Sequence, residues 1–220
     1  MSGRLYGVGV GPGDRVAMAL PNGPEAIVMF LAASMAGTAA PLNPNYKLEE
    51  FRFYLGDTGA RALVVPRGGG TEARQAAGPD TTVVEIDRDA AGEIRLEGAA
   101  HESCSSPADD EVALVLHTSG TTSRPKRVPL THANLTVSAK NIADTYKLTA
   151  EDVSLCVMPL FHVHGLVGST LATFYSGGTV VVPPAFNALS FWPLAEKYRA
   201  TWFSAVPAIH LMLLARAKGQ

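Results

Sequence analysis

Residues 112–126 read Val112-Ala113-Leu114-Val115-Leu116-His117-Thr118-Ser119-Gly120-Thr121-Thr122-Ser123-Arg124-Pro125-Lys126. The apolar run at 112–116 predicts a buried strand. The loop that follows brings together hydroxyl groups, a glycine and a lysine, and such donors and positive charge are typical of polyphosphate binding. A Walker A loop would need glycine directly before the lysine, where this chain has Pro125. We therefore expect a strand, a phosphate-binding loop and then a helix that begins near Thr131.

Strand-like and helix-like segments alternate along the rest of the chain. Short apolar runs predict strands, and longer segments bounded by Pro or Gly predict helices. The expected strands are 16–20, 38–42, 62–65, 112–116, 153–157, 179–182 and 202–206, and the expected helices are 24–36, 48–55 and 133–146. This alternation favours an α/β fold with largely parallel sheets flanked by helices.

The stretch 99–110 is rich in Ser, Pro and acidic residues and is the main candidate for a linker. It predicts an amino-terminal α/β subdomain over residues 1–110 and a second α/β segment over residues 111–220. The second segment would hold the phosphate loop.

The composition fits a soluble globular protein, because 47% of the 220 residues are hydrophobic and 17% are charged. A net charge of −2 gives no electrostatic basis for binding nucleic acid or an anionic membrane. No apolar run is long enough to predict a membrane span. Cys104 and Cys156 have no metal-type spacing, so a reducing, cytoplasmic setting is expected.

Four motifs in order carry a resemblance to a known family. They are Gly11-Pro12-Gly13-Asp14-Arg15-Val16 with Leu20-Pro21-Asn22, the segment 116–128, Met158-Pro159-Leu160-Phe161-His162-Val163-His164-Gly165, and Ser204-Ala205-Val206-Pro207. With them the chain resembles the adenylate-forming (AMP-binding) superfamily of the acyl-CoA synthetase type. The central motifs are most similar to those of the oxalate–CoA ligases.

The resemblance implies part of the large domain of an enzyme that uses ATP, Mg²⁺ and coenzyme A. Such an enzyme joins a carboxylic acid to AMP and then transfers the acyl group to a thiol. Lys126 would balance the phosphate charge as a catalytic residue, and Thr122 would also help to position Mg²⁺. The residues that would line the phosphates are Thr118, Ser119, Gly120, Thr121, Thr122 and Ser123.

Arg127 departs from the family pattern, because most relatives have glycine directly after the motif lysine. Glycine at such a place often serves a positive φ angle, which arginine adopts only at a cost. If the backbone lies elsewhere, Arg127 adds a second cation near the phosphates.

Three histidines are candidates for the acyl site. By resemblance, His162 borders the acyl and thiol channels as a catalytic residue, and His164 lines the acyl pocket. His210 is a further pocket candidate, although a place on a helix surface explains it equally well. Two histidines without nearby Cys, Asp or Glu do not make a zinc site. A histidine at 164 favours a small polar or anionic acid, since imidazole can meet a second carboxylate.

The family's adenine, ribose and catalytic-lysine motifs would lie beyond Gln220, so the chain is expected to be an amino-terminal fragment. Two alternatives remain at this point. One is a catalytically incomplete nucleotide-binding fragment, and the other is an amino-acid adenylation domain with a different acceptor. A downstream carrier-protein segment would favour the latter.

Overall fold

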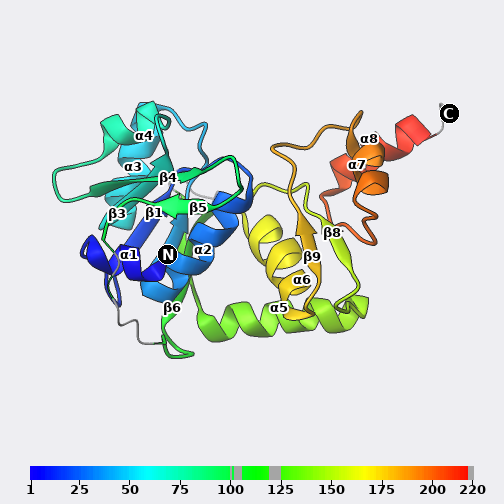
Figure 1. Cartoon of the computed structure of the whole chain (residues 1–220), viewed down its shortest axis with the longest axis horizontal. Helices are drawn as coiled ribbons and strands as arrows, with labels where there is room; N and C mark the ends of the chain where they lie inside the picture. Colours follow the sequence, from blue (N-terminus) through cyan, green and yellow to red (C-terminus); the bar gives the residue numbers. More distant parts are fainter. Residues whose placement is uncertain (100, 102–105, 119–124, 218–220) are drawn as a thin grey trace. The chain divides into compact units, whose positions relative to one another are not determined.

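The computed structural model describes residues 1–99, 101, 106–118 and 125–217. The chain folds as two compact units, Met1–Asn134 and Leu135–Gln220, and the helix α5 (His132–Tyr146) continues from the first unit into the second (Figure 1). This division lies later in the chain than the one predicted at residue 110. The reason is that the strands after residue 110 complete the sheet of unit 1.

Unit 1 is built on a seven-stranded sheet in the order β5-β4-β3-β1-β2-β6-β7. Its strands are β1 (Arg15–Met18), β2 (Thr38–Pro41), β3 (Ala62–Pro66), β4 (Thr82–Arg88), β5 (Ile94–Leu96), β6 (Val112–Thr118) and β7 (Lys126–Thr131). Its helices are α1 (Ser2–Gly7), α2 (Pro24–Ala36), α3 (Leu48–Thr58) and α4 (Thr71–Ala76). The five strands from β4 to β6 in this order are mutually parallel, whereas the outer strands β5 and β7 pair antiparallel. The predicted α/β fold with a largely parallel sheet is confirmed.

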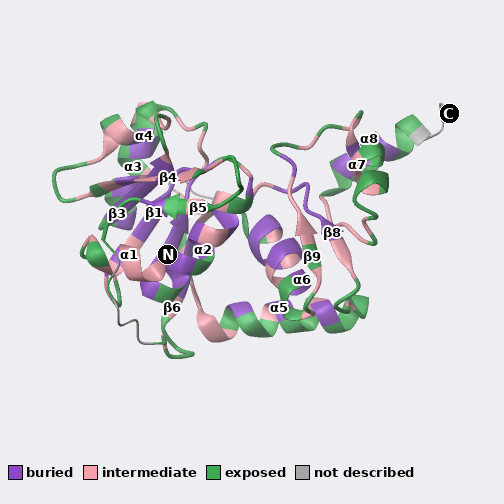
Figure 2. Cartoon of the chain, in the orientation of Figure 1, coloured by how far each residue is buried: buried purple, intermediate pink, exposed green. Residues whose placement is uncertain are grey.

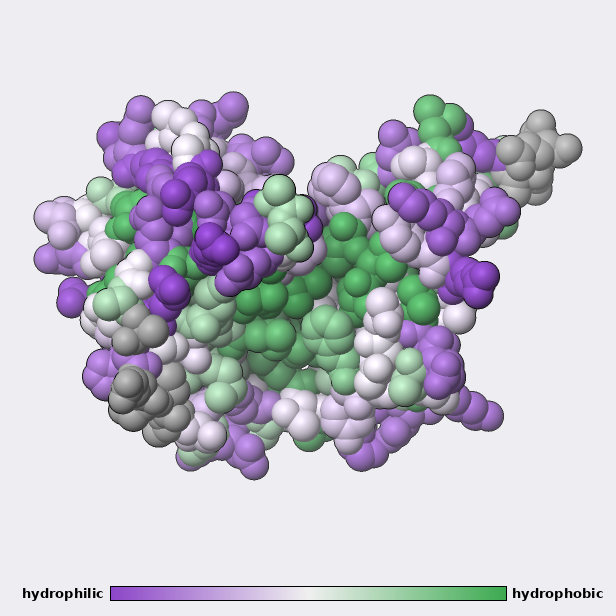
Figure 3. All heavy atoms as spheres, in the orientation of Figure 1, coloured by the Kyte–Doolittle hydropathy of each residue, from purple (hydrophilic) through white to green (hydrophobic). Residues whose placement is uncertain are grey.

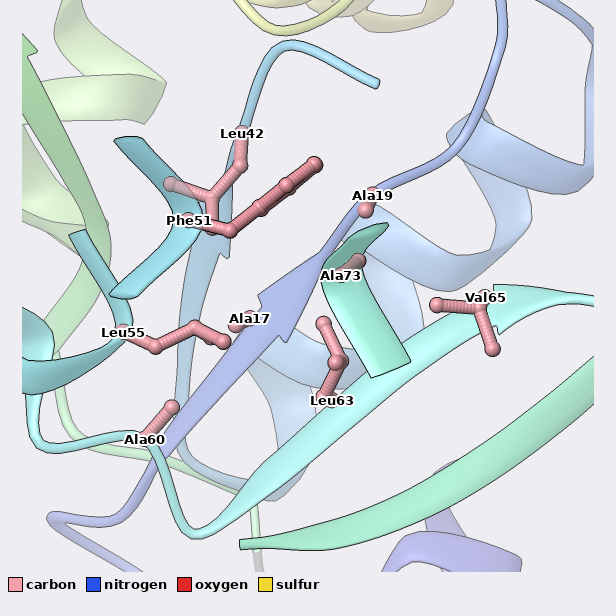
Figure 4. Packing of buried hydrophobic residues seen from close by; sticks show 9 residues of the cluster. All are labelled: Ala17, Ala19, Leu42, Phe51, Leu55, Ala60, Leu63, Val65 and Ala73. Atoms are coloured by element: carbon pink, nitrogen blue, oxygen red, sulfur yellow. The ribbon is translucent and has the colours of Figure 1, made fainter. Parts of the chain in front are cut away.

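One face of this sheet packs against α3 and α4. Figure 4 shows Ala17 of β1 and Leu63 of β3 facing Phe51 and Leu55 of α3, with Ala73 of α4 beside them. All five residues are buried, and buried residues also fill the centre of unit 1 in Figure 2. Ala17 and Ala19, which follows β1, are the small residues of the sheet in this cluster, and their size lets α3 approach closely.

The helix α2 has the bounds that were predicted from its end signals. Pro24 starts the helix, because proline lacks the N–H that the first turn leaves unpaired. Gly37 ends the helix at a point where the backbone of the loop before β1 comes close. A Cβ at Gly37 would lie 2.5 Å from the carbonyl oxygen of Asp14, so a larger residue does not fit.

Unit 2 contains a small parallel sheet and several helices. The elements are β8 (Val153–Leu155), the π-helix η1 (His164–Leu171), α6 (Ala172–Tyr175), β9 (Thr179–Val181), α7 (Phe191–Lys197) and α8 (Pro207–Ala217). The strand predicted at 202–206 was wrong, because Trp202 makes only an isolated bridge to Ser154. A second core joins Leu155 to Phe191 and Leu213.

Hydrophilic residues gather over α4, β4 and β5 in the view of Figure 3, where that part of unit 1 faces solvent. Within the described ranges, no helix is long and apolar enough to cross a membrane.

Candidate functional site

The phosphate loop predicted at 118–126 joins two antiparallel strands of unit 1. β6 ends at Thr118 and β7 begins at Lys126, and these two residues are paired across the hairpin. The predicted loop residues Ser119, Gly120, Thr121, Thr122 and Ser123 lie outside the described residues. The helix α5 follows at His132 as expected, but β7 was not foreseen.

The two described ends of the loop lie next to each other and face solvent. The Thr118 hydroxyl donates a long hydrogen bond of 3.5 Å to the carbonyl oxygen of Lys126, and both residues are exposed. Since β6 is parallel to β2, its carboxyl end lies at the same edge of the sheet as those of the other parallel strands. Ligands of open α/β sheets bind at this edge. Lys126 is therefore placed where an anion could reach its ammonium group.

The next cross-strand pair is His117 and Arg127. Because side chains alternate along a strand, these two lie on the face of the hairpin opposite to Thr118 and Lys126. His117 Nε2 lies 2.9 Å from Asp57 Oδ2, and Arg127 Nη1 donates to the Asp57 carbonyl oxygen at 2.5 Å. Arg127 has no positive φ angle, so it introduces no strain in place of glycine. A strained, positive-φ backbone at Arg127 is thereby excluded.

The predicted motif at 158–165 shapes the start of η1 in unit 2. A π-helix has a wider turn than an α-helix and is found mainly at functional sites. Gly165 permits it, since a Cβ there would lie 2.3 Å from the carbonyl oxygen of Pro159. The Thr170 hydroxyl donates to the Gly165 carbonyl at 2.8 Å, which satisfies one oxygen of this turn.

A pocket of about 430 Å³ opens beside this turn, entirely within unit 2. Its wall includes His164, whose Nε2 lies 2.8 Å from the hydroxyl oxygen of Ser204. Gly168 stands one turn further on, where a Cβ would approach the His164 ring to 3.3 Å. The lining residues are Ser138, Ile142, Tyr146, Val163, His164, Val167, Gly168 and Ser204. An apolar wall with one imidazole and two hydroxyl-bearing serines suits a small ligand that carries a polar end.

Burial lowers the pKa of His164 below its ordinary value and does the same for the pKa of His162. The neutral imidazole is thus favoured at neutral pH. A carboxylate beside the ring would act in the opposite direction, because a nearby negative charge favours the protonated form. Binding of an anionic acid at His164 would therefore be accompanied by proton uptake.

The three predicted histidines do not share one site in unit 2. His164 lines the pocket, whereas His162 is not on its wall; the His162 residue is exposed, but its ring is partly covered by Phe161, with the ring centroids 4.5 Å apart. His210 is exposed on α8, where its ring lies 5.1 Å from that of Phe203. Their roles at a substrate stay predictions, with His164 alone of the three on the wall of this pocket.

The helix α5 supplies lining residues that the sequence reasoning missed. Ser138, Ile142 and Tyr146 follow at intervals of four residues, so they form one stripe of the helix. The adjacent stripe, Leu135, Ala139 and Ala143, is the buried one. The apolar residues Leu135, Ala139 and Ala143 recur every four positions, and this period in the sequence could have indicated which face of α5 lies next to the pocket.

Among the described residues, Cys156 is not a reactive thiol, and no group of side chains could hold a metal ion. The Cys156 thiol is buried, and burial raises its pKa, which keeps it protonated and unreactive. In the part of the chain that the structure describes, no three His, Cys, Asp or Glu residues are grouped to hold a metal. Cys104 and Thr122, the residue predicted to help with Mg²⁺, lie outside that part.

Comparison with known proteins identifies the family of this chain. The model of the AMP-binding enzyme family covers residues 1–220. The chain belongs to the AMP-binding enzyme family. It is 46% identical to an oxalate–CoA ligase of Arabidopsis thaliana over 94% of this chain and 43% of that protein. It is 43% identical to an oxalate–CoA ligase of Saccharomyces cerevisiae over 96% of this chain and 44% of that protein.

The fold of this AMP-binding family member is also that of solved structures. The ATP-bound MatB of Rhodopseudomonas palustris superposes with a TM-score of 0.80 at 28% identity, over 97% of this chain and 44% of MatB. The chain thus spans less than half the length of each of these three relatives. The predicted membership of the adenylate-forming superfamily is confirmed.

Proposed function

We propose that the full-length protein is an AMP-forming acid–thiol ligase that activates a short acid, such as oxalate, with ATP and passes the acyl group to coenzyme A. Two CoA ligases with oxalate in their names are more than 40% identical to this chain. The observation that carries the proposal is the small pocket whose wall presents His164 beside Ser204. We place the protein in the cytoplasm, since its two cysteines have no disulfide-type pattern.

In the proposed reaction, a carboxylate oxygen of the acid attacks the α-phosphate of ATP, and pyrophosphate leaves. The thiol of coenzyme A then attacks the acyl carbon, and AMP leaves. Lys126 would offset the negative charge of the phosphates as it shifts during the first step. Mg²⁺ bound to ATP would add positive charge there, but the described residues offer no carboxylate cluster for it, so no step is assigned to the metal.

His164 would recognise the acid rather than carry out the chemistry. A second carboxylate that leaves water needs a hydrogen-bond donor or a cation as its partner. The imidazole supplies such a donor, and its contact with Ser204 fixes the plane of the ring. Among the described residues that line the pocket there is no Asp, Glu, Lys or Arg, so His164 is the group there that can take up a positive charge.

The function is tested by acid-dependent exchange of labelled pyrophosphate into ATP in the full-length protein. A panel of acids graded in length and charge should give the highest kcat/KM with a short diacid. Preference for medium or long aliphatic acids would refute the short diacid and leave the ligase intact. Release of the acyl group to a carrier protein but not to coenzyme A would favour an amino-acid-type adenylation enzyme.

The His164→Phe variant of the full-length protein is expected to raise KM for a short diacid about three- to tenfold, the value of one buried hydrogen bond. KM for a neutral-tailed monocarboxylate should change little, because that acid places no charge at the ring. His101→Phe is the matched control, since His101 is an exposed histidine of unit 1. Equal rises in KM for both acids would show that His164 contributes shape and not charge recognition.

A further inference from the structure

Three side chains from three strands converge on the carboxyl-terminal turn of α3. Arg15 of β1 donates from Nε to the Thr58 carbonyl at 2.9 Å and from Nη2 to the Gly59 carbonyl at 2.6 Å. Arg127 of β7 binds the next carbonyl, that of Asp57, as described above. The last carbonyls of a helix have no partner within it and carry partial negative charge, so cationic donors are favoured there.

His117 adds a second tie between the hairpin and this turn. Its side chain is only 6% exposed, and its Nε2 lies 2.9 Å from the Asp57 carboxylate. The Tyr54 ring packs edge-on against the imidazole, with the ring centroids 4.7 Å apart. The pair His117 and Arg127 is thus held to one residue, Asp57, through both its side chain and its backbone.

These contacts fix the position of Lys126, the first residue of β7. Arg127 and His117 form one cross-strand pair, and Lys126 and Thr118 form the next pair toward the loop. Because adjacent residues of a strand face opposite sides, a strand held by Arg127 on the α3 side directs Lys126 to the other side. A guanidinium hydrogen-bonded to Asp57 faces away from the side on which Lys126 lies.

We propose that Arg127 is a positioning residue, which anchors the phosphate-loop hairpin to the end of α3 and thereby sets the place of Lys126. The role of Lys126 at phosphate rests on the function proposed above. Arg127 itself does not bind phosphate. Its guanidinium supplies an anchor that a glycine at this place would lack.

The first test is hydrogen exchange of the full-length protein without ligands. Arg127→Gly should speed amide exchange in the peptide that covers 126–131, because the hairpin loses one of its two ties to α3. Arg127→Lys keeps a charged donor and should retain most of the protection. Arg95→Gly is the matched control: Arg95 is an exposed strand arginine that pairs with Asp89 and Glu93 and not with a helix end. Unchanged exchange at 126–131 in Arg127→Gly would overturn the proposal.

The second test is a double-mutant cycle on pyrophosphate exchange. Arg127→Gly alone should lower kcat/KM for ATP about three- to tenfold, in line with one cation at a helix end. In the Lys126→Ala background the same change should cost less than about twofold, since Arg127 acts through Lys126. An equal loss in both backgrounds would mean that Arg127 acts independently of Lys126, and the proposal would be wrong.

The two tests separate this inference from the proposed function. If the wild-type protein shows no acid-dependent exchange of pyrophosphate, the ligase proposal fails, and the amide-exchange result still decides whether Arg127 anchors the hairpin. If Arg127→Gly does not fold, the milder Arg127→Lys carries the comparison. Amide exchange in Arg127→Lys that stays close to wild type and is slower than in a folded Arg127→Ala variant supports the anchor, and exchange in Arg127→Lys identical to that of Arg127→Ala overturns it.

Discussion

The Lys126→Ala variant of the full-length protein is expected to exchange pyrophosphate into ATP at least tenfold more slowly than wild type. A hydrogen bond between charged groups is worth about 1.5–3 kcal/mol, which corresponds to roughly one to two decades in rate. Lys126 is exposed at the carboxyl edge of the sheet, so its loss should leave the fold intact. Steady-state exchange at saturating acid measures the rate, and the melting temperature checks the fold.

Lys140→Ala serves as the control for loss of a lysine. Lys140 lies on α5 and forms an exposed ion pair with Asp144 one turn later, a contact of little energetic value. Its removal should leave exchange within about twofold of wild type. Wild-type exchange by Lys126→Ala would remove this lysine from the phosphate site.

Gly165→Ala is expected to destabilise unit 2 by about 1–3 kcal/mol, because overpacking at a backbone contact forces the turn to move. The added Cβ would lie 2.3 Å from the carbonyl oxygen of Pro159 and 2.9 Å from that of Met158, and neither atom belongs to a flexible side chain. Both tryptophans of the sequence, Trp192 and Trp202, lie in unit 2, so their fluorescence reports its unfolding in urea.

Gly56→Ala is the opposite case in unit 1. Gly56 lies inside α3, and a Cβ there would meet no atom within 4 Å. Alanine should therefore stabilise the helix by about 1 kcal/mol through its higher helix propensity. Far-UV circular dichroism in urea measures the unfolding of the whole protein, and comparison with the tryptophan signal of unit 2 isolates the change in unit 1. For the Gly165→Ala variant, a free energy of unfolding equal to that of wild type would show that the π-helical turn accommodates the added methyl group without loss of stability.

Local signals in the sequence were sufficient for the central elements of unit 1. Pro24 and Gly37 mark the ends of α2, and the apolar runs of β1, β2 and β3 are continuous because both faces of the sheet are covered. The helix α3 was predicted three residues too short, since 56–58 lack an apolar pattern. The helix ends at Gly59, a left-handed C-cap that is a local sequence signal. Arg15, which is distant in sequence, then binds the Thr58 carbonyl, and no local pattern indicates that contact.

Elements that depend on partners far along the chain were not predictable in this way. β7 contains Lys126, Arg127 and Pro129, a composition typical of a loop, and it is a strand only because β6 pairs with it. The contact of His164 with Ser204 joins residues 40 positions apart, and no spacing rule indicates it. The motifs at 158–165 and 204–207 contain both residues, but the motifs do not predict the hydrogen bond between them.

The outer strands of the unit 1 sheet bear on solubility. A strand at the edge of a sheet offers unpaired N–H and C=O groups to any other extended chain, which is a route to aggregation. β7 lies at one edge with exposed Lys126 and Arg127, and Pro129 has no N–H to offer. At the other edge β5 is only three residues long and carries Arg95. The same Lys126 and Arg127 that shape the loop therefore also discourage copies of the protein from joining edge to edge.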